Sequence, residues 1–352
     1  MITETAPGKV ILTGEWGVLE SDCSCIVFPT PCVVKVEIIP QANFEIDLVS
    51  IHLPILKAEF VYKQFNWLQI DEEFIEKSEF VRKACEVALQ FLFENQIIIQ
   101  PFFLKTYGFD FSFDQKVGLG SSSAVVIAII KVIFKLHKFP FTSELLYKLG
   151  VIAHFYVQKK VGSGFDIAAS AYEKPLYYRR FDPKWLEQEI TRKKALNELF
   201  SSPWPNLLCQ EIQKSKEAIV LVGWTGEPSS TTELIKIFKE FKQNNSERWN
   251  QILSKINKTV EQVKESIEVN NLAFLQLIQQ NHQILLELNE FLPIYTEKLK
   301  FLVRIAEQSY FAGKLSGAGG GDCGIAVGFN RENIELIKRQ WKQAGIEFLF
   351  EL

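Results

Sequence analysis

Between Val10 and Phe60, apolar residues fall in short runs that are typical of β-strands. The runs "KVILTGEW", "CIVFPTPCVVKVEII" and "NFEIDLVSI" are rich in β-branched residues, and Gly, Pro and Asn interrupt them. From Ser78 the period changes, because apolar residues then recur at steps of three and four as far as Leu92. The pattern therefore predicts strands up to Phe60, followed by a helix with Ser78 as its N-cap.

The rest of the chain alternates between the same two patterns. "IIIQPFFLKTYGFDF" and "AIVLVGW" are strand-like, whereas helical periods run from about Ser122 to Leu136, from about Thr142 to Lys159 and from about Thr231 to Ser309. Near the end, "GKLSGAGGGDCGIAVGF" predicts strand, loop and strand, "RENIELIKRQWKQAG" a helix, and "IEFLFEL" a last strand. Both halves mix helices and strands, so the predicted fold class is α+β.

The length of 352 residues favours two domains, because single hydrophobic cores stop growing near about 250–300 residues. The stretch "SSPWPNLL", rich in Pro and Ser, marks a boundary between them. We therefore expect an N-terminal domain over residues 1–205 and a C-terminal domain over residues 206–352.

Charge and composition narrow the class of partner. With 39 basic and 42 acidic residues, the net charge of -3 gives no reason to expect nucleic acid or an anionic membrane. The N-terminus lacks the pattern of a secretory signal, and Lys131 interrupts the longest apolar run. The six cysteines form no C-x-x-C pair, which is typical of reduced thiols. We therefore expect a cytoplasmic protein, a monomer or homodimer, whose partners are small molecules.

A first glycine-rich stretch, "GLGSSS" at residues 118–123, precedes an apolar helix. Its small residues would let the backbone approach a ligand, and the N–H groups and positive dipole end of the helix would bind phosphate. Its serine hydroxyls could also coordinate Mg²⁺. An ordinary serine-capped helix would use the same residues, so the stretch alone leaves both interpretations open. It is not a Walker A loop, because G-x-x-x-x-G-K-[ST] is absent from the chain.

A second glycine-rich stretch, "GAGGGDCG" at residues 317–324, contains a literal G-x-G-x-x-G. A dinucleotide fingerprint needs a helix after the glycines, whereas "GIAVGF" predicts a strand. Because each glycine costs conformational entropy, so dense a run indicates close approach of the backbone to a ligand. Lys9, after a Pro-Gly turn, and Asp166, after "VGSGF", are further candidates; a solvated lysine and a helix N-cap are the alternatives.

In this order, "APGKVILTGEWGVL", "GLGSSSA" and "SGAGGGDCG" resemble the three motifs of the galactokinase, homoserine kinase, mevalonate kinase and phosphomevalonate kinase (GHMP kinase) superfamily. Within it, the chain is most similar to the phosphomevalonate kinases, through residues 153–183, residues 222–235 and "GAGGGDCGIA". The resemblance implies two α+β domains with the active site in the cleft between them. It also implies that the chain uses ATP to convert 5-phosphomevalonate to 5-diphosphomevalonate in the mevalonate pathway of isoprenoid biosynthesis. Mevalonate kinase, diphosphomevalonate decarboxylase and a non-catalytic ligand sensor are the alternatives.

The resemblance also implies roles for single residues. Lys9 would lie near the transferred phosphate and Asp166 would face the acceptor, orienting a phosphate or acting as base toward an alcohol. Ser122 would ligate Mg²⁺. Nucleotide binding is expected from Lys116, Gly118, Leu119, Gly120, Ser121, Ser122 and Ser123. Acceptor binding is expected from Ser163, Gly164, Gly317, Ala318, Gly319 and Gly320.

An acceptor with its own phosphate needs a second anion site, and "GEPSSTTELI" supplies one. Ser229, Ser230 and Thr231 stand at a predicted helix start, where hydroxyls and free N–H groups converge. Plain helix capping is the alternative. Lys116, Arg179 and Arg180 are candidate cations.

The chain departs from mevalonate kinases in one helix. These kinases carry a magnesium-binding glutamate on the helix before the aspartate motif, and the corresponding "LGVIAHFYVQKK" has no acidic residue. The departure disfavours a mevalonate kinase and leaves the Mg²⁺ ligands beyond Ser122 open.

Overall fold

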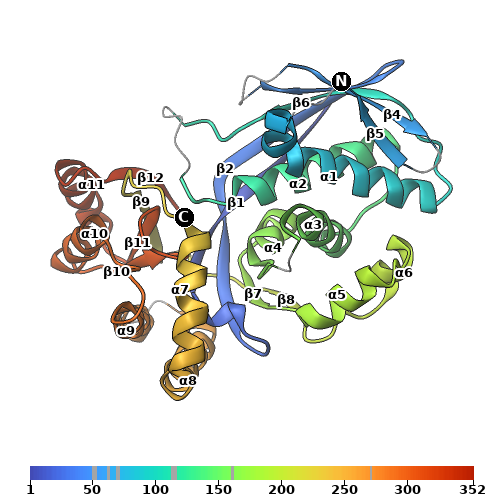
Figure 1. Ribbon diagram of the computed structural model, residues 1–352. Helices are drawn as coiled ribbons and strands as arrows, with labels where there is room; N and C mark the ends of the chain where they lie inside the picture. Colours follow the sequence, from blue (N-terminus) through green and yellow to red (C-terminus); the bar gives the residue numbers. More distant parts are fainter. Residues whose placement is uncertain (50–53, 62–63, 69–71, 112–116, 160–161, 270–271) are drawn as a thin grey trace.

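The computed structural model describes residues 1–352 except for residues 50–53, 62–63, 69–71, 112–116, 160–161 and 270–271. Within this part of the chain there are two sheets, and a long hairpin of the first sheet lies next to the second half of the molecule (Figure 1). The first sheet has the order β5-β4-β3-β6-β2-β7-β8, with β1 paired to β2. Neighbouring strands are antiparallel except for β3 and β6. Its strands are β1 (Ile2–Thr13), β2 (Ser24–Pro40), β3 (Phe44–Leu48), β4 (Leu56–Val61), β5 (Gln64–Leu68), β6 (Phe102–Tyr107), β7 (Leu176–Arg179) and β8 (Leu208–Glu211).

Helices pack against the first sheet, and α2 is the most deeply buried part of this layer. The two helices predicted here are confirmed: α2 covers Ser121–Leu136, and α3 covers Ser143–Gln158 with Thr142 as its N-cap. Ser78 as a helix start is wrong, because the residue lies inside α1, where its hydroxyl donates to the Phe74 carbonyl one turn earlier. The helices are α1 (Glu72–Glu94), α2, α3, α4 (Phe165–Tyr172), α5 (Pro183–Thr191) and α6 (Leu196–Ser201).

The second sheet is antiparallel throughout, with the order β10-β11-β9-β12. The predicted strand, loop and strand near the end of the chain are confirmed as β10 and β11. The strands are β9 (Ile219–Trp224), β10 (Ala312–Ser316), β11 (Cys323–Gly328) and β12 (Glu347–Glu351). The helices are α7 (Thr231–Asn244), α8 (Ser246–Ser266), α9 (Leu272–Asn289), α10 (Glu297–Gln308) and α11 (Ile334–Gln343), with short 3-10 turns at Gly17–Leu19 and Arg331–Asn333.

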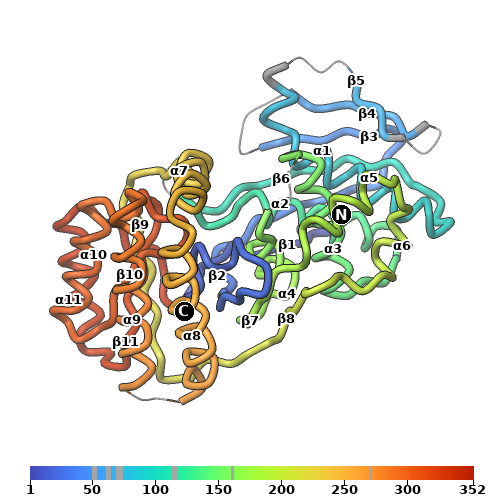
Figure 2. Tube along the Cα trace, turned by 60° about the horizontal axis from the view of Figure 1, so that its bottom comes forward, coloured from blue at the N-terminus to red at the C-terminus, as the bar shows by residue number. Residues whose placement is uncertain are grey.

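The β1–β2 hairpin contributes to both hydrophobic cores, because alternate residues of a strand face opposite sides. Ile11 and Val27 are buried in the core of the first sheet. Val10 and Leu12, the neighbours of Ile11, are buried in the core of the second sheet. Figure 2 shows the hairpin between the two halves from a second direction. The chain leaves the first sheet after β8 and enters the second at β9, so β8, which follows the predicted boundary at residue 205, still pairs with the first sheet.

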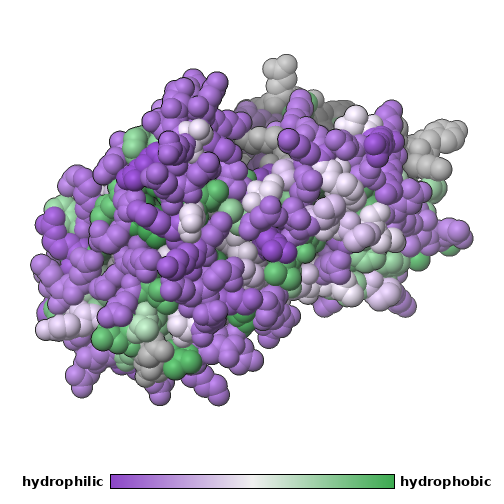
Figure 3. All heavy atoms as spheres, turned by 90° about the horizontal axis from the view of Figure 1, so that it is seen from below, coloured by the Kyte–Doolittle hydropathy of each residue, from purple (hydrophilic) through white to green (hydrophobic). Residues whose placement is uncertain are grey.

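The surface is mostly hydrophilic on the face drawn in Figure 3, with scattered hydrophobic side chains. In the described part of the chain, no helix combines the length and apolar character that crossing a bilayer requires.

Candidate active site

Segments that lie far apart in the sequence meet where β1 contacts β10. The Lys9 amide donates to the Leu119 carbonyl at 2.8 Å. From the other side, the Cys323 thiol donates to the Val117 carbonyl at 3.2 Å. The first glycine loop (residues 117–120) therefore lies between β1 and the second glycine loop (residues 317–322).

The first glycine loop reaches α2 in a left-handed conformation that suits glycine. Gly118 and Gly120 have φ angles of 74° and 81°, and Gly120 is the N-cap of α2. No described side chain caps the helix, and the Ser123 hydroxyl instead donates to the Gly120 carbonyl at 2.7 Å. The alternative of an ordinary serine-capped helix is therefore wrong. The first-turn N–H groups of α2 are left for an anion.

Lys9 lies against the first glycine loop. Its ammonium donates to the Gly118 carbonyl at 2.6 Å and is 5.9 Å from the centroid of the Phe165 ring. Phe165 opens α4 and directly precedes Asp166. Among the described residues Lys9 has no ion-pair partner within 4.0 Å, so Asp166 does not hold the lysine in this state.

Asp166 lies in the first turn of α4, and the helix N-cap is Gly164 instead, with a φ of 79°. The Asp166 carboxylate accepts from the Ile167 amide at 3.0 Å. Ser170, one turn later, donates its hydroxyl to the Pro7 carbonyl at 2.8 Å. This bond ties α4 to the strand that carries Lys9, and no sequence pattern singled out Ser170.

Two buried tyrosines shape the turn before Asp166. The Tyr147 and Tyr178 hydroxyls are 2.8 Å apart, and Tyr178 donates to the Ser163 carbonyl at 2.6 Å. A Cβ on Gly164 would lie 2.9 Å from the Tyr178 hydroxyl and 3.0 Å from the Tyr147 hydroxyl. The predicted acceptor residues Ser163 and Gly164 therefore sit on a turn that leaves no room for a side chain at Gly164.

His154 is a second buried group of this site, and sequence reasoning missed it. The residue lies on α3, is 7% exposed, and its Nε2 has no hydrogen-bond partner. Burial lowers the pKa of His154, while the Asp166 charge and the Ser122 backbone carbonyl raise it. The helix that lacks a carboxylate thus provides an imidazole that bonds to the Ser122 backbone and lies within range of the Asp166 charge.

The predicted second anion site is bound to the second glycine loop. The Ser229 hydroxyl donates to the Gly319 carbonyl at 2.5 Å, and the Ser229 amide donates to the Asp322 carboxylate at 3.2 Å. Ser230 caps α7, accepting from the Glu233 amide at 3.4 Å. The segment at residues 229–231 therefore combines the predicted helix start with the capping that was its alternative.

Two of the candidate cations are engaged away from these loops. Arg179 Nε donates to the Asn206 carbonyl at 3.0 Å, and an Arg180 NH1 group donates to the Leu19 carbonyl at 2.8 Å. Lys116 lies outside the described residues.

Two side chains of β10, Lys314 and Ser316, connect the start of the second glycine loop to β1 and to the turn that follows β1. Lys314 donates to the Glu15 carboxylate, and both side chains are fully buried. Burial raises the pKa of the Glu15 carboxyl and lowers the pKa of the Lys314 ammonium, and the partner's charge opposes each shift. Ser316 Oγ accepts from the Ile11 amide at 3.1 Å and donates to the Ile11 carbonyl at 3.0 Å. Glu15 belongs to the first motif and Lys314 lies two residues before the third, but nothing in the sequence pairs them.

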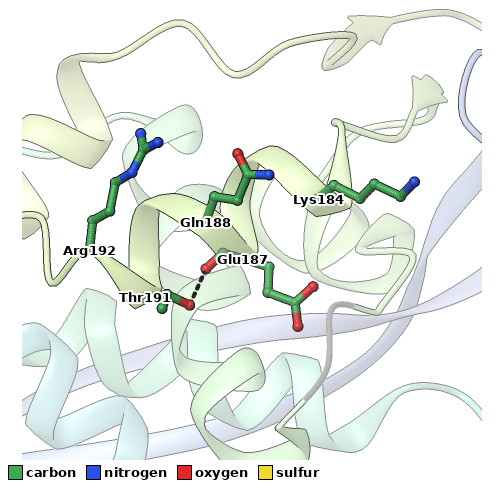
Figure 4. A pocket seen from close by; sticks show the side chains of 5 residues that line it. All are labelled: Lys184, Glu187, Gln188, Thr191 and Arg192. Atoms are coloured by element: carbon green, nitrogen blue, oxygen red, sulfur yellow. Dashed lines mark hydrogen bonds between the residues drawn. The ribbon is translucent and has the colours of Figure 1, made fainter.

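A hollow on the surface of α5 does not bring together segments that are distant in the sequence. Four side chains of this one helix and that of its C-cap residue line it, and Figure 4 shows them spread along the helix. The one bond drawn there runs from the Thr191 hydroxyl to the Glu187 carbonyl at 2.7 Å. The hollow is therefore not a candidate for catalysis. Its lining residues are Lys184, Glu187, Gln188, Thr191 and Arg192.

Comparison with known proteins places the chain among kinases. Residues 80–174 match the family described as GHMP kinases N terminal domain, and residues 269–347 match GHMP kinases C terminal. The phosphomevalonate kinase of Streptomyces sp. (strain CL190) is 24% identical over 361 residues, covering 98% of this chain and 95% of that protein. The mevalonate kinase of Pyrococcus horikoshii is 29% identical over 355 residues, covering 96% and 92%.

The fold is also that of a solved kinase structure. Streptococcus pneumoniae phosphomevalonate kinase in complex with phosphomevalonate and AMPPNP superposes with a TM-score of 0.86 at 24% identity, covering 100% of this chain and 99% of that chain. The predicted two-domain α+β fold is therefore confirmed.

Proposed function

The chain belongs to the GHMP kinase family and is an ATP-dependent kinase, and from this premise we propose that its acceptor is 5-phosphomevalonate. The reaction would transfer the γ-phosphoryl group of ATP to the acceptor phosphate, giving 5-diphosphomevalonate and ADP. One observation carries the proposal. The start of α7 is bound through Ser229 to the second glycine loop, which contacts the first, so two helix starts flank the same loops. Two helix N-termini suit a reaction between two phosphates.

The nucleotide phosphates would bind at the start of α2. Gly118 and Gly120 bring the backbone close, and the free N–H groups of the first turn donate to phosphate oxygens. Gly120 is sterically restricted here, because a Cβ would lie 3.1 Å from Ser123 Oγ and 3.2 Å from Lys9 Cγ.

A magnesium ion fits this site. Among the described residues no three His, Cys, Asp or Glu side chains form a metal cluster, but Mg²⁺ beside a nucleotide takes most of its ligands from phosphates and water. The Ser122 hydroxyl and the Asp166 carboxylate, both half-buried and both beside His154, would hold it. Bound there, Mg²⁺ offsets the negative charge of the phosphate oxygens.

Lys9 and Asp166 would divide the remaining work. The transition state of phosphoryl transfer spreads negative charge over three oxygens, and the Lys9 ammonium beside Gly118 lies where it would offset that charge. A phosphate monoester, with a second pKa of about 6, is already anionic at neutral pH and needs little help from a base. Asp166 would therefore orient the acceptor without removing a proton.

The acceptor is tested by offering mevalonate, 5-phosphomevalonate and 5-diphosphomevalonate in parallel, with Mg²⁺ and ATP, and recording ADP release and product masses. We expect turnover with 5-phosphomevalonate and a product heavier by one phosphoryl group. Equal or faster turnover with mevalonate would overturn the proposal, and release of CO₂ from 5-diphosphomevalonate would identify a decarboxylase.

The roles of Lys9 and Asp166 are tested by comparing kcat of Lys9→Ala and Asp166→Asn between about pH 6, near the second pKa of the phosphate, and alkaline pH. We expect the larger loss for Lys9→Ala, because two anions then meet without their cation. General-base catalysis is worth about 10²–10⁴-fold, so a larger loss for Asp166→Asn, recovering as the pH rises, would indicate a base and an alcohol acceptor.

A further inference from the structure

Asp322 is a carboxylate in a loop otherwise built for glycine. Gly319, Gly320 and Gly321 have φ angles of 77°, 73° and 133°, and Asp322 follows with 52°. A left-handed conformation strains an ordinary residue, although Asp tolerates it better than most. A glycine at residue 322 would be free of this strain. Backbone strain of this kind is typical of functional sites, so the contacts of the Asp322 side chain are relevant to function.

The main chain of Asp322 fixes the end of the loop without help from its side chain. The Asp322 amide donates to the Glu227 carbonyl at 2.7 Å. The Asp322 carbonyl accepts from the Thr225 amide at 2.9 Å and from the Thr225 hydroxyl at 3.0 Å. Any residue could make these bonds, so the loop path does not require a carboxylate.

The side chain of Asp322 connects the two glycine loops and the start of α7. Its Oδ1 accepts from the Ser229 amide at 3.2 Å. The other side of the carboxylate packs against Gly118. A Cβ on Gly118 would be only 2.5 Å from both Cγ and Oδ2 of Asp322, so Asp322 fills the space that a side chain there would need. The carboxylate therefore touches the nucleotide side and the acceptor side of the proposed site at once.

We propose that Asp322 is a positioning residue that sets the distance between the first glycine loop and the start of α7. The inference rests on the proposed function, because it places the acceptor phosphate at the start of α7. Misplacement of reacting groups by about 1 Å can cost about 10²-fold in rate. Asp322 acts through the loops that it separates and does not itself take part in the transfer.

The test compares Asp322→Gly with Asp322→Asn. Glycine relieves the strain and removes the spacer, so we expect an unchanged or higher Tm with kcat lower by about 10–100-fold. Asparagine keeps the volume over Gly118 and an oxygen for the Ser229 amide, so it should retain kcat within about fivefold, the cost of about one weakened hydrogen bond. KM for ATP should change little in both variants, because the start of α2 is intact.

Asp22→Gly is the matched control, since Asp22 is exposed, also left-handed with a φ of 66°, and lies in the turn before β2. It should raise or preserve Tm and leave kcat unchanged.

Three results would each overturn the inference. They are wild-type kcat in Asp322→Gly, an equally large loss in Asp322→Asn, and a lowered Tm with parallel losses in kcat and both KM values. The assay uses whichever acceptor the wild-type enzyme phosphorylates. A wrong acceptor assignment is then seen in the wild-type enzyme alone, and the comparison of variants still decides the role of Asp322.

Discussion

The two glycine-rich loops have similar compositions and touch each other, but different parts of the chain fix them. The first loop is shaped locally, by the start of α2 and by the Ser123 hydroxyl three residues away from Gly120. The second loop is shaped by distant segments: Gly320 donates to the Ile294 carbonyl at 2.7 Å, and Lys314 on the strand before it binds Glu15. Substitutions in the first loop should therefore change activity more than stability, and substitutions that break the distant backbone and ion-pair contacts of the second should change stability first.

The largest expected effect on stability comes from disrupting the buried Glu15–Lys314 ion pair, which anchors the second loop. Glu15→Gln leaves the Lys314 ammonium buried without its partner, and we expect the free energy of unfolding to fall by about 3–5 kcal/mol. Urea unfolding measures it. Glu335→Gln is the control, because its ion pair with Lys338 is exposed and should cost less than about 1 kcal/mol. Adding Lys314→Met to Glu15→Gln should recover much of the loss, and equal losses for Glu15→Gln and Glu335→Gln would contradict this account.

A second test compares two glycines inside the second loop. A Cβ on Gly319 would lie 2.4 Å from the Ile294 carbonyl oxygen, whereas one on Gly317 would meet nothing within 4 Å. Both residues are left-handed, with φ angles of 77° and 105°. We expect Gly319→Ala to lower the free energy of unfolding by about 3 kcal/mol through overpacking and strain, and Gly317→Ala by about 1 kcal/mol through strain alone. Equal losses would show that backbone conformation, not the contact with Ile294, limits the loop.

A substitution next to the first loop should have the opposite effect, lowering activity while leaving stability nearly unchanged. Ser122→Ala removes a proposed Mg²⁺ ligand from a half-buried position and fills no space. We expect kcat/KM for Mg-ATP to fall by about 10–100-fold while the free energy of unfolding changes by less than about 0.5 kcal/mol. A titration of activity with Mg²⁺ should shift to higher concentration, and an unshifted titration would remove Ser122 from the metal site.

The smallest expected effect is the pH dependence that His282 contributes beside the second loop. His282 Nδ1 lies 2.7 Å from the Tyr295 hydroxyl beside this anchor, and burial, with the nearby Lys314 charge, lowers the pKa of His282 to about 4. In the unfolded chain His282 has an ordinary pKa of about 6.5, so between pH values of about 4 and about 6.5 the unfolded state binds more protons than the folded state. The contribution of neutral His282 to stability is therefore complete above this pH range and is lost as the pH falls through it. The free energy of unfolding should drop by about 1 kcal/mol between pH 7 and about pH 5.5.

His282→Gln should remove this contribution, so the stability of the variant should depend less on pH than that of the wild type. Parallel stability curves for the two proteins would exclude His282 as the source.

Local chemistry was readable from the sequence, and long-range contacts were not. The helical period from about Thr142 to Lys159 is confirmed as α3, and the Thr142 side chain caps its first turn. Ser78 misled because a serine inside a helix can bond back to the preceding turn, which looks the same in sequence as a cap. The partners of Asp322 and Lys314 are 93 and 299 residues away, and no spacing rule covers such distances.

The division of β1 between two cores has a consequence during synthesis on the ribosome. Val10 and Leu12 leave the exit tunnel before the strands of the second sheet are made, but they are buried in the core of that sheet. Ser316, which binds the backbone of the intervening Ile11, is made 305 residues later. At about 5–20 residues per second that interval is about 15–60 s. One apolar side of the β1–β2 hairpin therefore stays uncovered until the second sheet has been translated, and this is the interval in which a chaperone would be needed most.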